Sequence, residues 1–97
     1  MPTFIALANF TDQGVKAAKD SVNRAEAVKS MAEKHGVKLK DIYWTMGAYD
    51  VVAIFEAPDG PTMSAVALAI AAAGNVRSQT LRAYPKEEMR EILKKLP

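Results

Sequence analysis

The residues best suited to chemistry lie in the middle of the chain, where the segment GAYD (residues 47–50) separates two apolar stretches. A two-residue hairpin turn favours Asn-Gly or Asp-Gly, because both of its central residues need a positive φ. Ala48 and Tyr49 are therefore untypical of such a turn. A tight turn alone therefore does not explain why these residue types occur in the segment.

Two interpretations of this corner stay open. In a structural one, Gly47 supplies a positive φ, Asp50 accepts hydrogen bonds from turn amides, and Tyr49 packs against a neighbouring strand or subunit. In a functional one, Tyr49 and Asp50 present a donor and an acceptor at the mouth of a pocket. There they would hold an amine or act as an acid/base pair.

Two arginines follow on a stretch expected to be a strand, residues 75–84. Arg77 and Arg82 lie five positions apart, an odd offset, so they point to opposite sides of the sheet. We expect one of them to face the interior or a subunit contact, where charges are seldom left unpaired. It would pair with Asp41, Asp50 or Glu56, or receive an anionic ligand.

Aromatic residues and the single histidine complete the candidates. Tyr43 and Trp44 occupy successive strand positions and thus opposite faces, and Trp44 serves either as a core or interface anchor or as a pocket wall. His35 precedes Gly36 and is best placed to cap the end of a helix.

The composition excludes several classes of site. With no cysteine and one histidine, a disulfide and a thiolate nucleophile are absent, and a metal site would need carboxylates. The acids Glu87, Glu88 and Glu91 are more simply paired with nearby basic residues. No phosphate-binding glycine loop, dinucleotide fingerprint or Ser-His-Asp set occurs. We therefore expect no metal and no cofactor.

The charge and the apolar runs of the sequence bear on nucleic-acid and membrane partners and on the cellular location. The formal net charge is +2 and basic residues are mixed with acidic ones, which argues against nucleic-acid binding. The apolar run at residues 63–74 is shorter than the roughly 20 residues that a membrane-spanning helix needs. No secretory signal pattern begins the sequence. We expect a cytoplasmic protein with no membrane partner.

Periodicity predicts an α+β fold in a single domain, residues 1–97. Strands are expected at residues 3–10, 37–46, 50–57 and 75–84, with helices at 12–35, 62–73 and from Pro85 onward. The first helix should break near residues 20–23, because a continuous helix would far outrun the strand it follows. This order predicts a ferredoxin-like βαββαβ plait with a four-stranded antiparallel sheet and an added C-terminal helix.

The apolar pattern also predicts self-association. The first strand alternates Ile5 and Leu7 on one face with Phe4 and Ala6 on the other, so both faces are apolar. The third strand repeats this arrangement. Because the two main helices cover only one face of the sheet, we expect the sheet of a second copy to cover the other.

Three segments carry a resemblance to a known family. They are FTDQGVKAAKDSVNRAEAV, MGAYDVVAIFEAPD and GNVRSQTLRAY, in that order and over nearly the whole chain. Together they resemble the GYD-domain family, whose signature falls on Gly47, Tyr49 and Asp50, with Ala48 in the variable slot. The resemblance implies a ferredoxin-like plait related to the dimeric α/β barrels and implies no particular activity.

A more distant similarity points to a ligand. The chain is similar to the effector-binding domain of the Lrp/AsnC regulators, in which a comparable corner lies close to an amino-acid site at subunit contacts. It lacks the helix-turn-helix of those regulators. The similarity implies a small-molecule site close to the corner residues Gly47, Tyr49 and Asp50. Adding the aromatic and basic candidates above gives a candidate ligand site of Trp44, Gly47, Tyr49, Asp50, Arg77 and Arg82.

Our leading functional hypothesis is an oligomeric small-molecule-binding or regulatory module without catalysis of its own. One alternative is a cofactor-independent enzyme of the dimeric α/β barrel type, an isomerase or monooxygenase. Another is a purely structural assembly protein. A closed, water-filled cavity lined by His35, Tyr49 and Asp50 would favour the enzyme, and a pocket at a subunit contact would favour the binding module.

Overall fold

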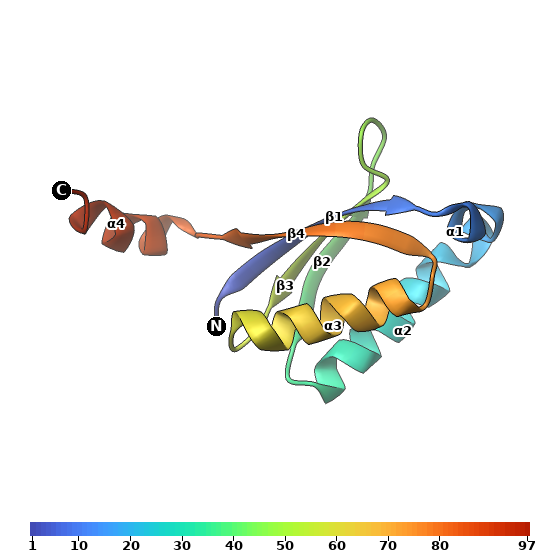
Figure 1. Cartoon of the computed structure of the whole chain (residues 1–97), viewed down its shortest axis with the longest axis horizontal. Helices are drawn as coiled ribbons and strands as arrows, with labels where there is room; N and C mark the ends of the chain where they lie inside the picture. The colour runs from blue at the N-terminus through green and yellow to red at the C-terminus, as the bar shows by residue number, and fades with distance from the viewer.

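The computed structural model describes residues 1–97 and contains one sheet with helices on one side of it (Figure 1). The elements in chain order are β1 (Thr3–Phe10), α1 (Asp12–Lys16), a 3₁₀ turn η1 (Ala18–Asp20), α2 (Ser21–Lys34), β2 (Lys38–Trp44), β3 (Val51–Glu56), α3 (Gly60–Ala72), β4 (Val76–Ala83) and α4 (Lys86–Lys94).

The sheet has the strand order β2-β3-β1-β4, and every neighbouring pair is antiparallel. Phe4 lies opposite Phe55 on β3 and opposite Arg82 on β4, which fixes the register across the centre of the sheet. This is the predicted α+β, ferredoxin-like plait. A bulge between Leu39 and Asp41 shifts the alternation of side chains along β2.

The predicted break in the first helical region is confirmed, and it falls at η1. Asp20 occupies the N-cap position of α2 but makes no capping hydrogen bond with its side chain. Instead, the hydroxyl of Ser21 donates to the carbonyl of Ala18 at 2.5 Å. His35 lies at the C-cap position of α2, where its backbone N–H donates to the carbonyl of Ala32 at 2.9 Å and the N–H of Gly36 donates to that of Glu33 at 3.1 Å.

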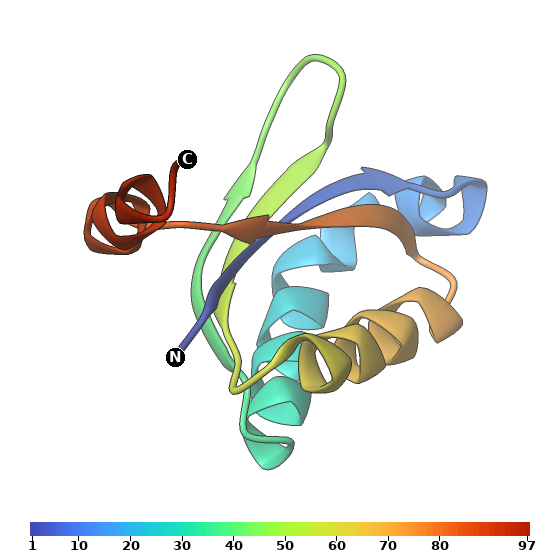
Figure 2. The same cartoon turned by 60° about the vertical axis from the view of Figure 1, so that its left-hand side comes forward.

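The hydrophobic core lies between the two main helices and the inner face of the sheet. Phe55 is the largest fully buried side chain and packs in one cluster with Phe4, Leu39 and Met63. α2 lies against β2 and α3 against β4, so the two helices cover the two halves of the same, inner face of the sheet (Figure 2). Of the residues of α3 that the apolar pattern predicts to face the core, Met63 and Val66 are buried and Ala67 and Ile70 are half-buried, but Ala71 is exposed. Leu68 on the other side of the helix is 71% exposed.

The opposite side of the sheet, which we call the outer face, carries no helix. Alternation from the paired register places six apolar residues on it: Ile5, Leu7, Tyr43, Val52, Ile54 and Leu81. These side chains are half-buried or exposed in the single chain. The two-sided apolar character predicted for β1 and β3 is therefore present.

α4 extends away from the rest of the molecule along the direction of β4 (Figure 1). The molecule measures 49 × 31 × 18 Å, and its radius of gyration of 14.4 Å exceeds the value of about 13 Å typical of a compact domain of this size. One contact between α4 and the body is the ion pair of Glu88 with Arg82. The apolar side of α4 is left without a partner in the single chain.

Candidate functional site: an apolar cavity and an unpartnered helix

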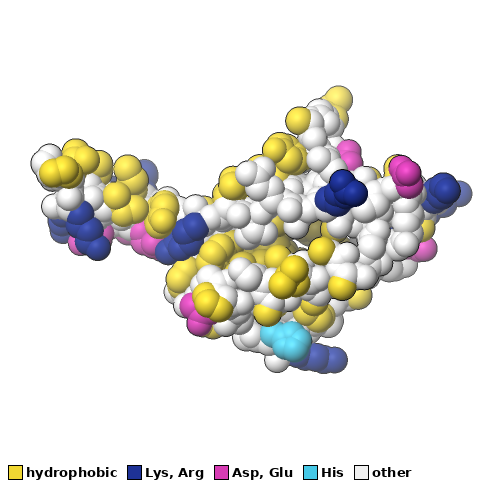
Figure 3. All heavy atoms as spheres, viewed as in Figure 1, with side chains coloured by type: hydrophobic (Ala, Val, Ile, Leu, Met, Phe, Trp, Pro, Cys, Tyr) yellow, Lys and Arg dark blue, Asp and Glu magenta, His cyan; other side chains and the backbone are white.

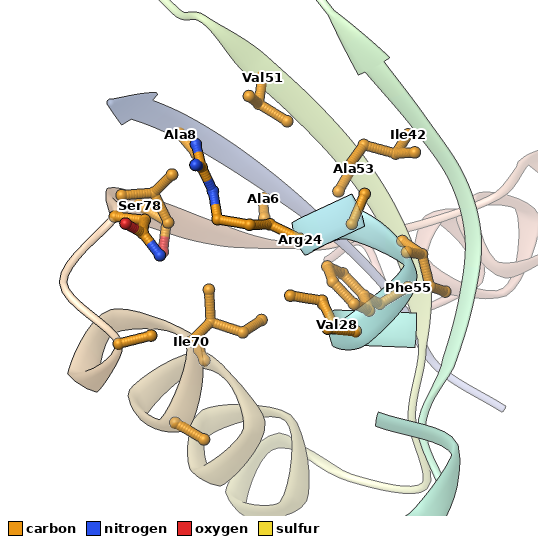
Figure 4. Close-up of a pocket in the computed structure, with 18 of the residues that line it drawn as sticks. Ala6, Ala8, Arg24, Val28, Ile42, Val51, Ala53, Phe55, Ile70 and Ser78 are labelled. Atoms are coloured by element: carbon orange, nitrogen blue, oxygen red, sulfur yellow. The ribbon is translucent and has the colours of Figure 1, made fainter. Parts of the chain in front are cut away.

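A cavity of about 310 Å³ lies between the inner face of the sheet and helices α2 and α3. It is lined by 24 residues, of which 19 are hydrophobic. Figure 4 shows side chains from both helices and from the sheet converging on it, and Figure 3 shows hydrophobic side chains in the gap between α3 and β4. The cavity has the predominantly apolar lining typical of small-molecule sites.

Small side chains create this space. Ala6, Ala8 and Ala53 form its floor on the two central strands, and Ala25 and Ala67 line it from the helices. A larger residue at any of these positions would fill the hollow between the helices, as in an ordinary close-packed interior. The alanines therefore keep a cavity open in a region that larger side chains would fill.

Polar groups gather at one end of the cavity. Arg24, in the first turn of α2, points into this end together with Ser78 of β4, and Phe55 lies at the other end (Figure 4). Arg24 donates hydrogen bonds to the carbonyls of Ala17 at 2.7 Å and Gly14 at 3.1 Å. Its guanidinium carbon lies 5.9 Å from the centre of the Phe10 ring.

The polar end is held together by a close contact between α1 and the turn that follows α3. Thr11 Oγ1 donates to the carbonyl of Gly74 at 2.6 Å, and the N–H of Thr11 donates to the carbonyl of Asn75 at 3.1 Å. A Cβ atom on Gly14 would come within 1.9 Å of the Asn75 oxygen. Only glycine therefore lets α1 approach this closely.

The corner at residues 47–50 lies in a loop that projects beyond the sheet between β2 and β3 (Figure 2). Gly47 has the predicted positive φ, at 105°. The side chain of Thr45 closes the loop by donating to the carbonyl of Tyr49 at 2.6 Å. Neither Gly47, Tyr49 nor Asp50 lines the cavity.

Asp50 makes contacts that differ from the predicted turn amides. Its carboxylate accepts a hydrogen bond from the backbone N–H of Phe10 at 3.0 Å, and its own N–H donates to the carbonyl of Ala8 at 2.9 Å. Asp50 thus continues the pairing of β3 with β1 after the two backbones diverge. These contacts support the structural interpretation of Asp50, and a ligand role for the corner stays a prediction.

The two arginines of β4 point to opposite sides of the sheet, as the register requires. Arg82 is paired, and its partner is Glu88 of α4 at 2.8 Å, not one of the three acids considered from the sequence. It also lies over the rings of Phe4 and Tyr84. Arg77 is exposed on the outer face, where no ion pair includes it.

Trp44 is the one predicted site residue that lines the cavity. The structure therefore does not bring the six candidates into one site. Arg24 and the alanine floor were missed by sequence reasoning, because an arginine early in a helix looks like an ordinary surface residue. A usable signal was the run of alanines at the inward positions of β1, where larger residues are usual.

The fold and the cavity together define a class: a small ferredoxin-like α+β domain with a pocket between its sheet and helices. Comparison with known families narrows this class. The model of the GYD domain matches residues 4–93, and the chain belongs to the GYD domain family.

Two relatives come from Thermus thermophilus. A protein named "Glutamine synthetase and cystathionine beta-lyase binding protein" is 35% identical over 95 residues, which cover 97% of this chain and 100% of that protein. A crystal structure of a protein from the same organism aligns with a TM-score of 0.56 at 25% identity, covering 89% of this chain and 100% of that one. Both likenesses extend over most of the fold.

None of the helices in the structure has both the length and the apolar character required to cross a membrane.

Proposed function

We propose that this protein is a cytoplasmic, homo-oligomeric binding module that attaches to an enzyme and holds a small molecule. The observation that carries the proposal is the end-to-end similarity to the Thermus protein named for binding glutamine synthetase and cystathionine β-lyase. Because the match covers all of that relative, the surface that it uses must lie in the region shared with this chain. Those two enzymes are therefore the first candidate partners.

We assign the enzyme contact to α4. Met89, Ile92 and Leu93 of α4 and Leu96 just after it follow the i, i+3, i+4, i+7 spacing of helices that dock into a groove of a partner. They are 38–73% exposed in the single chain. Figure 3 shows hydrophobic side chains along one side of α4 and charged ones along the other.

The charged residues on the other side of α4 pair with one another within the helix. Lys94 pairs with Glu91 at 3.0 Å, and Arg90 pairs with Glu87, each three residues apart. A helix of nine residues is marginal in water without tertiary contacts. The apolar side of α4 is thus the part that gains stability from docking, which supports its assignment to a partner.

We assign self-association to the outer face. Ile5, Leu7, Val52 and Ile54 form its centre, where β1 and β3 pair. A continuous apolar sheet face on a small domain is typical of an interface. Pairing of two outer faces would leave both cavities, which lie on the inner faces, outside the interface.

The lining of the cavity favours binding over catalysis. Its polar members are Ser21, Arg24, Asn75, Ser78 and Thr80, with no carboxylate and no histidine. Acid/base chemistry needs a group that exchanges a proton near neutral pH, and an arginine does not. The existence of a cavity in turn favours a binding module over a purely structural assembly protein.

The enzyme contact is tested by mixing the purified protein with glutamine synthetase and with cystathionine β-lyase from its own organism. Size-exclusion chromatography should show stable co-elution with at least one of them at micromolar concentration. Failure to co-elute with either enzyme, in the presence and absence of its substrates, would contradict the proposed partners.

A further inference from the structure

We propose that the cavity between the sheet and helices α2 and α3 binds a small apolar carboxylate, with Arg24 holding the acid group. This inference rests on the small-molecule part of the proposed function and names the chemistry of that ligand. It also places the ligand site on the inner face of the sheet and not at the residue 47–50 corner, whose residues do not line the cavity.

The size of the cavity limits the ligand. A volume of about 310 Å³ equals that of roughly ten water molecules at about 30 Å³ each. A ligand on the order of ten non-hydrogen atoms fits, whereas a nucleotide or a long acyl chain does not. Because 19 of the 24 lining residues are hydrophobic, most of the ligand must be apolar.

The charge at the polar end determines the functional group. The four ion pairs of the structure join Lys40 to Glu56, Arg82 to Glu88, Arg90 to Glu87 and Lys94 to Glu91, and none includes Arg24. Two carbonyl oxygens take two of its five N–H donors. The remaining donors of the planar guanidinium match a carboxylate.

The lining also discriminates against amino acids. No aspartate or glutamate lines the cavity, so the ammonium group of an α-amino acid would lose water without gaining a counter-charge. A carboxylate that lacks the amine avoids this cost. The orientation follows: the acid group lies beside Arg24 and Ser78, and the apolar part extends towards Phe55.

Phenylacetate is a suitable probe, with phenylacetamide and phenylalanine as matched comparisons. The chain has a single tryptophan, and Trp44 lines the cavity, so its fluorescence reports binding directly. We expect saturable binding of phenylacetate and much weaker binding of the amide and the amino acid. Equal binding of acid and amide, or no binding of the acid at millimolar concentration, would overturn the proposal.

Two variants locate the site. Arg24→Gln should weaken phenylacetate binding about ten- to hundredfold, because a charged hydrogen bond is lost. The matched control Arg77→Gln removes an exposed outer-face arginine and should leave binding unchanged. If Arg77→Gln weakens binding as much as Arg24→Gln, the anion is attracted by the overall positive charge of the protein, and the proposed site is wrong.

A cavity-filling variant separates ligand binding from folding. Ala67→Leu places a larger side chain into the hollow and should abolish binding while keeping or raising the melting temperature. Ala72→Leu makes the same change on the same helix outside the lining and should bind normally. Full binding by a folded Ala67→Leu variant would contradict the location.

The enzyme contact is measured separately. Ala67→Leu should still co-elute with the enzyme partner, because α4 is untouched. Loss of phenylacetate binding with retained co-elution would leave the enzyme-binding proposal intact. Phenylacetate binding without any co-elution would overturn the enzyme partners and leave the cavity proposal standing.

Discussion

Gly14 lies where α1 passes directly over the carbonyl of Asn75, and this residue-scale contact fixes the polar end of the cavity. A Cβ atom at this position would lie 1.9 Å from that oxygen, so the backbone must shift. We expect Gly14→Ala to lower the free energy of unfolding by about 1–3 kcal/mol, the usual cost of overpacking. Urea denaturation measures the effect.

Lys16→Ala is the control for Gly14→Ala, because it changes an exposed residue of the same short helix. It should alter stability by less than about 0.5 kcal/mol. A Gly14→Ala variant as stable as the control would show that α1 does not approach Asn75 so closely.

Asp50 provides a second residue-scale prediction. Asp50→Asn keeps an acceptor oxygen for the N–H of Phe10 and should cost at most about 1 kcal/mol. Asp50→Ala leaves that N–H without its partner and should cost about 1–3 kcal/mol. Denaturant titration of both variants tests this order. A loss of about 3–5 kcal/mol in Asp50→Asn would instead indicate that its charge holds a buried cation.

For single residues, the sequence predicted on which face of the sheet a side chain lies, but not which residues it contacts. The separation of Arg77 from Arg82 fixed their opposite directions, and burial of charge predicted a partner for one of them. The partner itself, Glu88, is supplied by α4, whose position no local pattern determines. Likewise, the residues around Arg24 in the sequence do not show that it faces a cavity, because the cavity forms only when the sheet, α2 and α3 pack together.

At the scale of elements, α3 begins at a cap that responds to pH. Asp59 accepts a hydrogen bond from the N–H of Thr62 at 2.7 Å. Hydrogen bonds from the side chain and the backbone of Thr62 lower the pKa of Asp59 below its ordinary value of 3.8. The ionised cap therefore stabilises the folded chain above that value, and the contribution is lost as the pH falls through the lower, folded-state pKa.

Asp59→Asn tests this assignment, since asparagine also caps helices but does not titrate in this range. The wild type should be more stable than the variant at pH 7, and the difference should shrink below about pH 3.8. Thermal unfolding across this pH range measures it. A difference that stays constant or grows as the pH falls would contradict the role of the carboxylate.

Periodicity and chain length predicted the helices, the strands and the break in the first helical region, but not which residues of that region face the core. The sequence suggests one apolar stripe from Val15 through Val22 to Ala32. In the structure η1 separates α1 from α2, and Val15 and Val22 are 54% and 60% exposed while Ala32 is fully buried. The existence of a break followed from chain length, but its geometry depends on the contact between α1 and the turn after α3.

At the scale of the whole molecule, the outer face predicts self-association. Light scattering at micromolar concentration should give at least twice the chain mass of 10.5 kDa. Ile54→Lys changes the outer face and should give a folded chain of lower mass. Phe55→Lys changes a core residue that is 2% exposed and should unfold the chain instead.

A clean monomer for the wild-type protein would contradict this assignment, as would an Ile54→Lys variant of unchanged mass. The alternation of side chains in β1 and β3 predicted both the fold and the two apolar faces. It could not predict the hollow, because the size of a cavity depends on how far apart α2 and α3 lie. The added C-terminal helix was predicted from the residues after Pro85 and is present as α4, but its projection away from the body was not predicted.

Calorimetric titration of the enzyme partner with three forms of the protein tests whether α4 is the enzyme-binding element. Ile92→Asp places a charge in the apolar stripe, and Met46→Asp places one at a 95% exposed loop residue far from α4. The wild type and Met46→Asp should bind with the same affinity, and Ile92→Asp should bind at least about tenfold more weakly, since a buried charge disrupts a groove contact. Equal affinity of all three forms would contradict the assignment of the enzyme contact to α4.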